Sequence, residues 1–213
     1  MAVRYLLFDN DGVLVESEHL YYQANAEILA EQGFELTRPA FAHTSLGLGE
    51  SVLRLCPGID DARHAALTEQ RDQRYDALLE AADNLAMPGV SDLLPRLAER
   101  YQMAVVTSCR PRHFSRIHRD TGLLGHMAFV LAKGDYARSK PHPDPYLTAL
   151  ERFSADASEA VVIEDSPRGL ASARAAGIRC AVLRSALTAE LNFDGAWRVI
   201  DGLAELPGVL AQV

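Results

Sequence analysis

Positive charge, and lysine in particular, is scarce in this chain. Its 213 residues include 21 lysine and arginine side chains against 29 aspartates and glutamates, a formal net charge of −8. Lys133 and Lys140 are the only lysines. So acidic a protein repels nucleic acids and anionic lipids, which argues against both as partners. An anionic small-molecule substrate would therefore need a local cluster of positive charge.

Long apolar runs and paired cysteines are lacking as well. No uninterrupted apolar stretch approaches ~18 residues, the length that spans a bilayer, so we expect no membrane segment. The first residues lead directly into an apolar strand, without the basic and apolar regions of a signal peptide. Cys56, Cys109 and Cys180 are far apart and do not have metal-ligand spacing. We expect reduced thiols and a cytoplasmic protein.

What the chain does contain is a regular alternation of strand-like and helical segments after the break at Met87-Pro88-Gly89. Apolar runs of strand length recur there at the βαβ spacing of a parallel sheet. One further strand precedes a stretch that is helical throughout. The expected strands are 3–8, 103–106, 129–131, 160–163, 179–183 and 197–200; the expected helices are 18–32, 60–82, 90–100, 111–121, 143–153 and 167–176, with short helices interrupted by Gly47 and Gly49 over 37–55.

This order predicts an α/β fold: a Rossmann-like, doubly wound parallel sheet core with an inserted α-helical cap domain. The core comprises residues 1–15 and 85–213, and the cap residues 16–84. A helical insertion at the ligand-binding edge of a sheet can close over a site and exclude water. No apolar surface stripe stands out, so we expect a monomer or a weak homodimer.

The most informative segment follows the first strand, where Asp9 and Asp11 stand two residues apart before Gly12. Open α/β sheets bind their ligands at the carboxyl ends of the strands. Two carboxylates so close repel each other, and a divalent cation would remove this conflict while leaving one oxygen free to attack. An Asx turn or a helix N-cap explains the same residues without any chemistry. The segment alone leaves both interpretations open.

Three other strand ends carry residues that such a site would need. Thr107 and Ser108 offer hydroxyl and amide donors to phosphate oxygens, although an N-cap is the simpler interpretation. Lys140, in a proline-rich loop, can bring a compact positive charge to a phosphate, although most loop lysines are merely solvated. Glu164 and Asp165 end a strand in two acids, whose oxygens suit Mg²⁺ and also suit helix capping. Four such coincidences on separate strands favour one shared site.

Taken together, these segments resemble the motifs of the haloacid dehalogenase-like hydrolase superfamily, in the branch that contains β-phosphoglucomutase and small sugar-phosphate phosphatases. The likeness covers nearly the full length, including the helical insertion. It is specific for superfamily and mechanism but says little about the substrate. The matching segments are Asp9-Asn10-Asp11-Gly12-Val13-Leu14, Thr107, Lys140-Pro141, and Glu164-Asp165-Ser166-Pro167-Arg168-Gly169.

The resemblance implies a two-step phosphoryl transfer. Asp9 is the implied nucleophile, which forms an aspartyl-phosphate. Asp11 is the implied general acid and base, a role that contributes ~10²–10⁴-fold. The implied Mg²⁺ ligands are Asp9, Asp11 through its backbone carbonyl, Glu164 and Asp165, and the implied phosphate ligands are Thr107, Lys140 and the loop around Asn10 and Ser108.

The expected function is hydrolysis of a small phosphorylated metabolite, such as a sugar or sugar-acid phosphate. Dehalogenases of this superfamily lack the second acid of the first motif, so the presence of Asp11 disfavours that reaction. Phosphonatases need a cap lysine, and residues 16–84 contain none. The arginines available for cap contacts with an anionic substrate are Arg38, Arg54, Arg63, Arg71 and Arg74.

Two alternatives remain open at this stage. The first is a β-phosphoglucomutase-like mutase, which has a histidine near the position of Tyr21 and a cap arginine where residues 46–51 carry none. The second is a non-catalytic regulatory or binding protein on the same fold. Such a protein is expected to have lost Asp9, Asp11 or Lys140, and all three are present.

Overall fold

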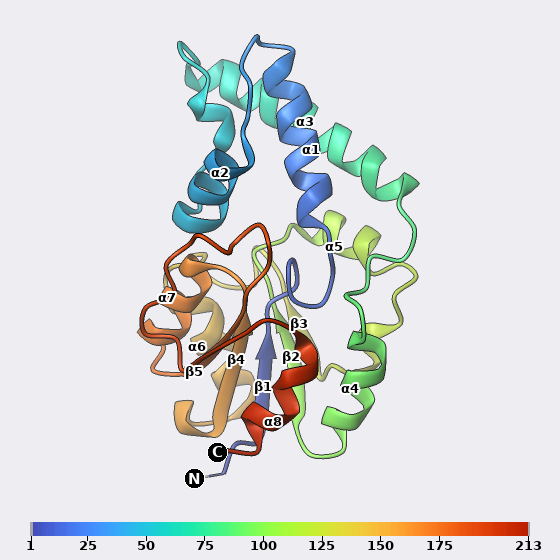
Figure 1. The fold of residues 1–213 in the computed structure, drawn as a ribbon, viewed down its shortest axis with the longest axis vertical. Coiled ribbons are helices and arrows are strands. Elements are labelled where there is room, and N and C mark those ends of the chain that lie inside the picture. The colour runs from blue at the N-terminus through green and yellow to red at the C-terminus, as the bar shows by residue number, and fades with distance from the viewer. Residues whose placement is uncertain (1, 213) are drawn as a thin grey trace.

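A six-stranded sheet forms the centre of the protein. The computed structural model describes residues 2–212; Met1 and Val213, the two ends of the predicted core, lie outside this range. The strand order is β3-β2-β1-β4-β5-β6, and each neighbouring pair is parallel, which confirms the predicted doubly wound α/β fold (Figure 1). The strands are β1 (Tyr5–Phe8), β2 (Gln102–Val106), β3 (Phe129–Leu131), β4 (Ala160–Glu164), β5 (Arg179–Leu183) and β6 (Arg198–Ile200).

Helices cover both faces of this sheet. Leu6 and Phe8 of β1 pack on one side with α4, α5 and α8, whereas Tyr5 and Leu7 pack on the other side with α6 and α7. Because neither face meets water, the strand has a continuous apolar sequence instead of an alternating one. The covering helices are α4 (Val90–Ala98), α5 (Pro111–Ile117), α6 (Asp144–Phe153), α7 (Pro167–Ala175) and α8 (Leu206–Leu210).

Helices α1 (Glu18–Ala30), α2 (Arg38–Phe41) and α3 (Asp61–Ala81) lie beyond the carboxyl ends of the strands (Figure 1). We call residues 18–81 the helical layer. It has its own apolar core, in which Phe41, Leu53 and Leu67 are fully buried. In the part of the chain that the structure describes, no helix has both the length and the apolar character to cross a bilayer.

The two connections to the helical layer run side by side. The Glu16 amide donates to the Leu85 carbonyl at 2.8 Å, and the Met87 amide donates to the Leu14 carbonyl at 2.9 Å. The outgoing and returning segments are therefore paired by backbone hydrogen bonds directly below the layer.

One segment of the helical layer differs from the sequence expectation. Gly47 does not interrupt a helix: α2 continues into a π-helix, Ala42–Leu48, that includes Gly47. The chain turns only at Gly49, whose φ of +73° suits glycine, and the following amide donates back to the Thr44 carbonyl at 2.9 Å.

The helix expected over 111–121 is also shorter than predicted. It ends at Ile117, because the next residue, His118, is held by its ring between Thr121 at 2.9 Å and Asn10 at 2.6 Å. Most other helix and strand ends lie within one or two residues of the predicted positions.

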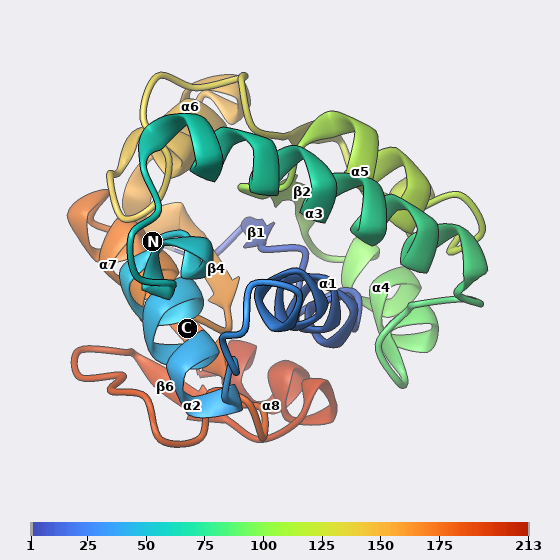
Figure 2. The ribbon, with the colours of Figure 1, turned by 90° about the horizontal axis from the view of Figure 1, so that it is seen from above.

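A ladder of ion pairs joins α3 to α5, which lie side by side (Figure 2). The acids of α3 recur every four residues, so they share one face of the helix. Most of the bases come from α5 and its two ends. The pairs are Asp72 with Arg110 and Arg112, Asp76 with Arg112 and Arg116, and Glu80 with Arg116 and Arg119. The ring of His113, whose pKa is lowered chiefly by burial, lies 3.4 Å from Asp76.

Asp72 is the best buried member of this ladder, with 1% of its side chain exposed, and it also accepts from the buried guanidinium of Arg71 at 2.9 Å. We expect Asp72→Asn to lower the free energy of unfolding by about 3 kcal/mol, because it leaves Arg71 buried without a carboxylate. Urea denaturation measures this loss.

The matched control is Asp61→Asn, which removes an exposed acid of the same helix that pairs with Arg54 at the surface. Exposed pairs contribute little, so its denaturation midpoint should not move measurably. Equal losses from the two variants would contradict a structural role for the ladder.

Candidate active site

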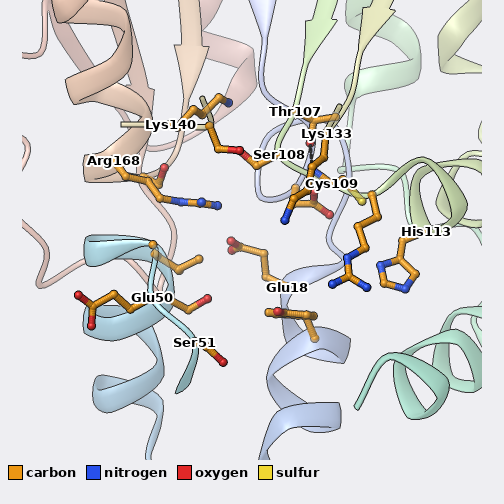
Figure 3. Close-up of a pocket in the computed structure, with 18 of the residues that line it drawn as sticks. Glu18, Glu50, Ser51, Thr107, Ser108, Cys109, His113, Lys133, Lys140 and Arg168 are labelled. Atoms are coloured by element: carbon orange, nitrogen blue, oxygen red, sulfur yellow. Dashed lines mark hydrogen bonds between the residues drawn. The ribbon is translucent and has the colours of Figure 1, made fainter. Parts of the chain in front are cut away.

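The strand ends and the helical layer enclose a cavity of about 430 Å³ (Figure 3). Six of the predicted site residues line it, and all come from the ends of β1, β2 and β4 or from the loop before α6. These residues are Asp9, Asp11, Thr107, Ser108, Lys140 and Asp165. Of the arginines predicted as cap contacts, only Arg71 lines the cavity.

Lys140 lies in the middle of this group and is almost completely buried. Its Nζ is 3.0 Å from Asp9 Oδ1 and donates to Glu164 Oε1 at 2.7 Å and to the Val106 carbonyl at 2.9 Å. Burial alone would lower the pKa of Lys140, but the carboxylates of Asp9 and Glu164 outweigh it and raise the pKa above its usual value. The lysine therefore stays charged and offsets the two acids.

Asp9 is a buried carboxylate with too little positive charge around it. Burial and the nearby Glu164 raise its pKa to about 7, although Lys140 and a 2.7 Å hydrogen bond from the Asn10 amide oppose the rise. A divalent cation beside Asp9 would stabilise the charged form that a nucleophile needs.

Asp11 lies on the cavity wall and accepts a hydrogen bond from the hydroxyl of Ser17. Ser17 immediately precedes α1. The orientation of the second acid is thus tied to the first residue of the connection into the helical layer.

The hydroxyl groups of Thr107 and Ser108 differ in whether they already make a hydrogen bond. The Thr107 hydroxyl accepts from the Cys109 amide at 3.0 Å, which holds the turn after β2. The buried Ser108 Oγ has no hydrogen-bond partner among the described residues, so it is available to an oxygen of a bound anion. Both side chains face the cavity (Figure 3).

Glu164 does not line the cavity, because its carboxylate is already enclosed by hydrogen bonds. Its Oε1 accepts from Lys140 and from the Tyr146 hydroxyl at 2.9 Å. Its Oε2 accepts from the amides of Asp165 and Ser166 and from the Ser166 hydroxyl, at 3.0–3.2 Å. Burial alone would raise the pKa of Glu164, but Lys140 lowers it. Glu164 therefore serves chiefly as the counter-ion of Lys140.

The carboxylate of Asp165 is buried, and no compensating positive charge from residues 2–212 is in contact with it. Its Oδ2 is buried and has no hydrogen-bond partner among the described residues. Burial, and then the carboxylates of Glu18, Glu164 and Asp9, raise its pKa well above the usual value. Oxygens of Asp9, Glu164 and Asp165 lie within 4.8 Å of one another. The orphaned carboxylate oxygen and this spacing fit a hard divalent cation.

Gly12 allows the acids to come so close. Its φ is +76°, and a methyl group at this position would overlap the Asp165 carboxylate. Glycine is thus required for both its backbone conformation and its missing side chain.

The side chain of Asn10 is turned away from the cavity. It is fully buried and bonds His118 Nε2 at 2.6 Å. Burial lowers the pKa of His118 to about 4, so its ring is neutral at pH 7. The Asn10 amide in turn donates to Asp9, so the predicted contact of Asn10 with phosphate would have to replace that hydrogen bond. The side chain ties the loop after β1 to the residue that follows α5.

Several charged residues line the cavity without being predicted as site residues; they are Glu18, Glu50, Asp72, Arg110, Lys133 and Arg168. From the sequence, Glu18 only begins a helix, and Arg168 only belongs to a motif. Burial and the carboxylates of Asp11 and Asp9 raise the pKa of Glu18 to about 8. The signal that could have found Glu18 is an acid in the first helical turn after two motif acids.

The comparisons with known proteins agree with this geometry. The family model for haloacid dehalogenase-like hydrolases matches residues 6–183. The chain is 33% identical to Protein CbbY of Rhodobacter capsulatus, over 94% of each chain. It is 32% identical to validoxylamine A 7′-phosphate phosphatase of Streptomyces hygroscopicus subsp. limoneus, over 86% of this chain and 87% of that protein. The crystal structure of CbbY from Rhodobacter sphaeroides with xylulose-(1,5)-bisphosphate has a TM-score of 0.79 at 28% identity, covering 96% of both chains.

Fold and site together define a hydrolase with a Rossmann-like core and an acid-rich site at the carboxyl edge of its sheet. The chain belongs to the haloacid dehalogenase-like hydrolase family, as the resemblance predicted. It is an enzyme of the phosphatase type within that family.

Gly169 offers a test of the Glu164 arrangement, because a methyl group there would overlap the Glu164 carboxylate. We expect Gly169→Ala to lower the free energy of unfolding by about 1–3 kcal/mol, through overpacking, even though alanine favours helices. It should also lower kcat at least tenfold, because Lys140 loses its fixed partner. Denaturation curves and phosphate release measure the two effects.

Gly208→Ala is the matched control, because Gly208 is also helical and nothing lies within 4 Å of its added methyl group. It should keep kcat and be equally or slightly more stable. If Gly169→Ala behaved in the same way, Glu164 would not need its observed position.

Proposed function

We propose that this protein is a Mg²⁺-dependent phosphatase that hydrolyses a small phosphorylated metabolite of the sugar-phosphate type through an aspartyl-phosphate. The observation that carries the proposal is Asp9, a buried carboxylate held beside the Lys140 ammonium and close to the unpartnered oxygen of Asp165. The named relatives include a phosphatase and a protein crystallised with a sugar bisphosphate, which supports the substrate class.

In the first step Asp9 attacks the phosphorus in line with the leaving oxygen. Lys140, Thr107 and Ser108 hold phosphoryl oxygens, and the charge of Lys140 offsets the repulsion between carboxylate and phosphate. Asp11, held by Ser17, donates a proton to the leaving oxygen. In the second step Asp11 takes a proton from the water that hydrolyses the aspartyl-phosphate.

Asp9, Asp165 and the backbone carbonyl of Asp11 would hold the Mg²⁺, which neutralises charge on the phosphoryl oxygens when bound. Glu164 acts on this site through Lys140, since both of its oxygens are engaged in hydrogen bonds. The Lys140 ammonium and a bound Mg²⁺ would therefore both offset the negative charge of the phosphate.

We further propose that residues 16–84 form a cap that opens for substrate and closes for chemistry, on a core of residues 1–15 and 85–213. The paired connections next to Leu14 and Leu85 suit a hinge, because within residues 2–212 the backbone passes between core and layer at these two places. Closure over the cavity excludes water that would compete with substrate hydroxyls.

The direct test is a panel of phosphomonoesters assayed for released phosphate with and without Mg²⁺. Wild-type protein should release phosphate only with the cation, and Asp9→Asn should be slower by about 10³-fold or more, since it removes the nucleophile. Acid-quenched reactions with radiolabelled substrate should trap labelled protein for the wild type alone.

Asp92→Asn, an exposed acid in α4, controls for the substitution itself and should keep full activity. If Asp9→Asn hydrolysed the substrates as fast as the wild type, Asp9 would not be the nucleophile. Conversion of one sugar phosphate into its isomer without phosphate release would instead identify a mutase.

The pKa of Asp9, raised to about 7 by burial, also predicts how Mg²⁺ binding depends on pH. Below pH 7 a proton occupies Asp9 and must leave before the cation binds; above pH 7 it has already left. The apparent Mg²⁺ dissociation constant should rise about 20-fold from pH 7.5 to pH 5.5. Isothermal titration calorimetry measures it, and Asp9→Asn should weaken the dependence without abolishing it, because burial also raises the pKa of Asp165 and its proton must still leave. A wild-type constant that stays the same across this range would exclude Asp9 as a ligand.

A further inference from the structure

Most cations of the cavity are already engaged by carboxylates. Lys140 is shared by Asp9 and Glu164. Arg71 and Arg110 both bind Asp72, and Arg71 also donates to the Tyr21 hydroxyl and to Asn25 Oδ1 at 3.1 Å. This leaves few positive charges to receive a second anionic group. The remaining cavity cations without a salt bridge among the described residues are Lys133, exposed at the rim, and Arg168, whose charge acts on Glu18, Glu164 and Asp165.

Glu18 is an acid without a hydrogen-bond partner among the described residues, although it is partly buried. It is the first residue of α1 and points into the cavity from the helical layer (Figure 3). A methyl group added at Gly12 would lie 3.1 Å from Glu18 Oε2 and 2.1 Å from Asp165 Oδ2. The carboxylate of Glu18 is therefore close to that of Asp165. Its carboxyl group needs a donor that the protein does not supply.

Arg168 faces Glu18 across the cavity from the first turn of α7 (Figure 3). Its buried Nε has no hydrogen-bond partner among the described residues. Its aliphatic stem packs against Gly49: a methyl group added at Gly49 would lie 3.3 Å from Arg168 Cδ. Arg168 is therefore held in place by the helical layer, with its donors left open.

We propose that Glu18 and Arg168 together recognise the hydroxyl groups of the leaving group, so that the preferred substrate is the monophosphate of a neutral polyol. A hydroxyl both donates and accepts, so one hydroxyl or a vicinal pair can donate to Glu18 and accept from Arg168. An unhydroxylated leaving group would leave both groups desolvated and unpaired in the closed cavity. This inference rests on the proposed phosphatase function and specifies its substrate.

The same charges disfavour a second phosphate on the substrate. Glu18 and Glu50 both line the cavity on the side of the helical layer, so the carboxylates there repel a second phosphate. Binding it at Arg110 would compete with Asp72 for that guanidinium. Like-charge contact and a lost ion pair both oppose a bisphosphate.

The test compares three substrates: a polyol monophosphate such as glucose 6-phosphate, an n-alkyl phosphate of equal chain length, and a sugar bisphosphate. Wild-type protein should have its highest kcat/KM for the monophosphate. Glu18→Met should lower that kcat/KM by about 10- to 100-fold, the effect of losing a hydrogen bond to a charged group. The loss for the alkyl phosphate should be at least tenfold smaller, so the discrimination ratio falls.

Glu18→Gln, which keeps an acceptor oxygen, should restore part of the discrimination. Arg168→Gln, on a different element, should reduce the same ratio and guards against a folding defect in one variant. Glu151→Met is the matched control: Glu151 is an exposed glutamate of α6 that does not line the cavity, and its replacement should leave both rates within twofold.

Equal losses on the polyol and alkyl phosphates would overturn the proposal, as would a wild-type preference for the bisphosphate through Lys133 or Arg110. A tenfold weaker Mg²⁺ affinity of Glu18→Met, measured by calorimetry without substrate, would reassign Glu18 to the metal site. If the wild type releases phosphate from none of the three, the proposed function itself fails. The outcomes are therefore distinguishable.

Discussion

An ammonium group enclosed between two carboxylates is the interaction on which the site depends. Lys140 loses almost all its water and is stabilised there by Asp9 and Glu164 together. Neither acid alone would offset the cost of burying the charge. Because Asp9 follows β1 and Glu164 ends β4, the neighbouring position of these two strands in the sheet is what creates the lysine site. The order of the strands in the sheet thus determines which carboxylates surround Lys140.

The second constraint is the surplus of negative charge that remains. Asp9, Asp11, Glu18 and Asp165 crowd around one end of the cavity, and burial together with the neighbouring carboxylates raises the pKa values of Asp9, Glu18 and Asp165. Such a cluster is stable in its charged form only with a cation present. Gly12 permits the crowding, since any side chain there would displace Asp165.

Helix α5 connects the helical layer with the catalytic loop. Its arginines bind the acids of α3, and the residue after it, His118, bonds Asn10, which lies between Asp9 and Asp11 in the chain. Ser17 makes a second connection, from the start of the layer to Asp11. A movement of the layer therefore reaches the catalytic loop through two short routes of hydrogen bonds and ion pairs.

The sequence alone determined the sheet, most helix positions and the residues at the strand ends, because these depend on local periodicity and on the rule that parallel strands end at one edge. Only the tertiary structure decided that Glu164 serves Lys140, that Asn10 turns toward His118, and that Glu18 and Arg168 face each other. Those partners are far apart in the chain, and no local pattern sets the direction of a side chain. Packing of α1, α5 and α7 against the sheet sets it, because each buried polar group must find a partner within reach.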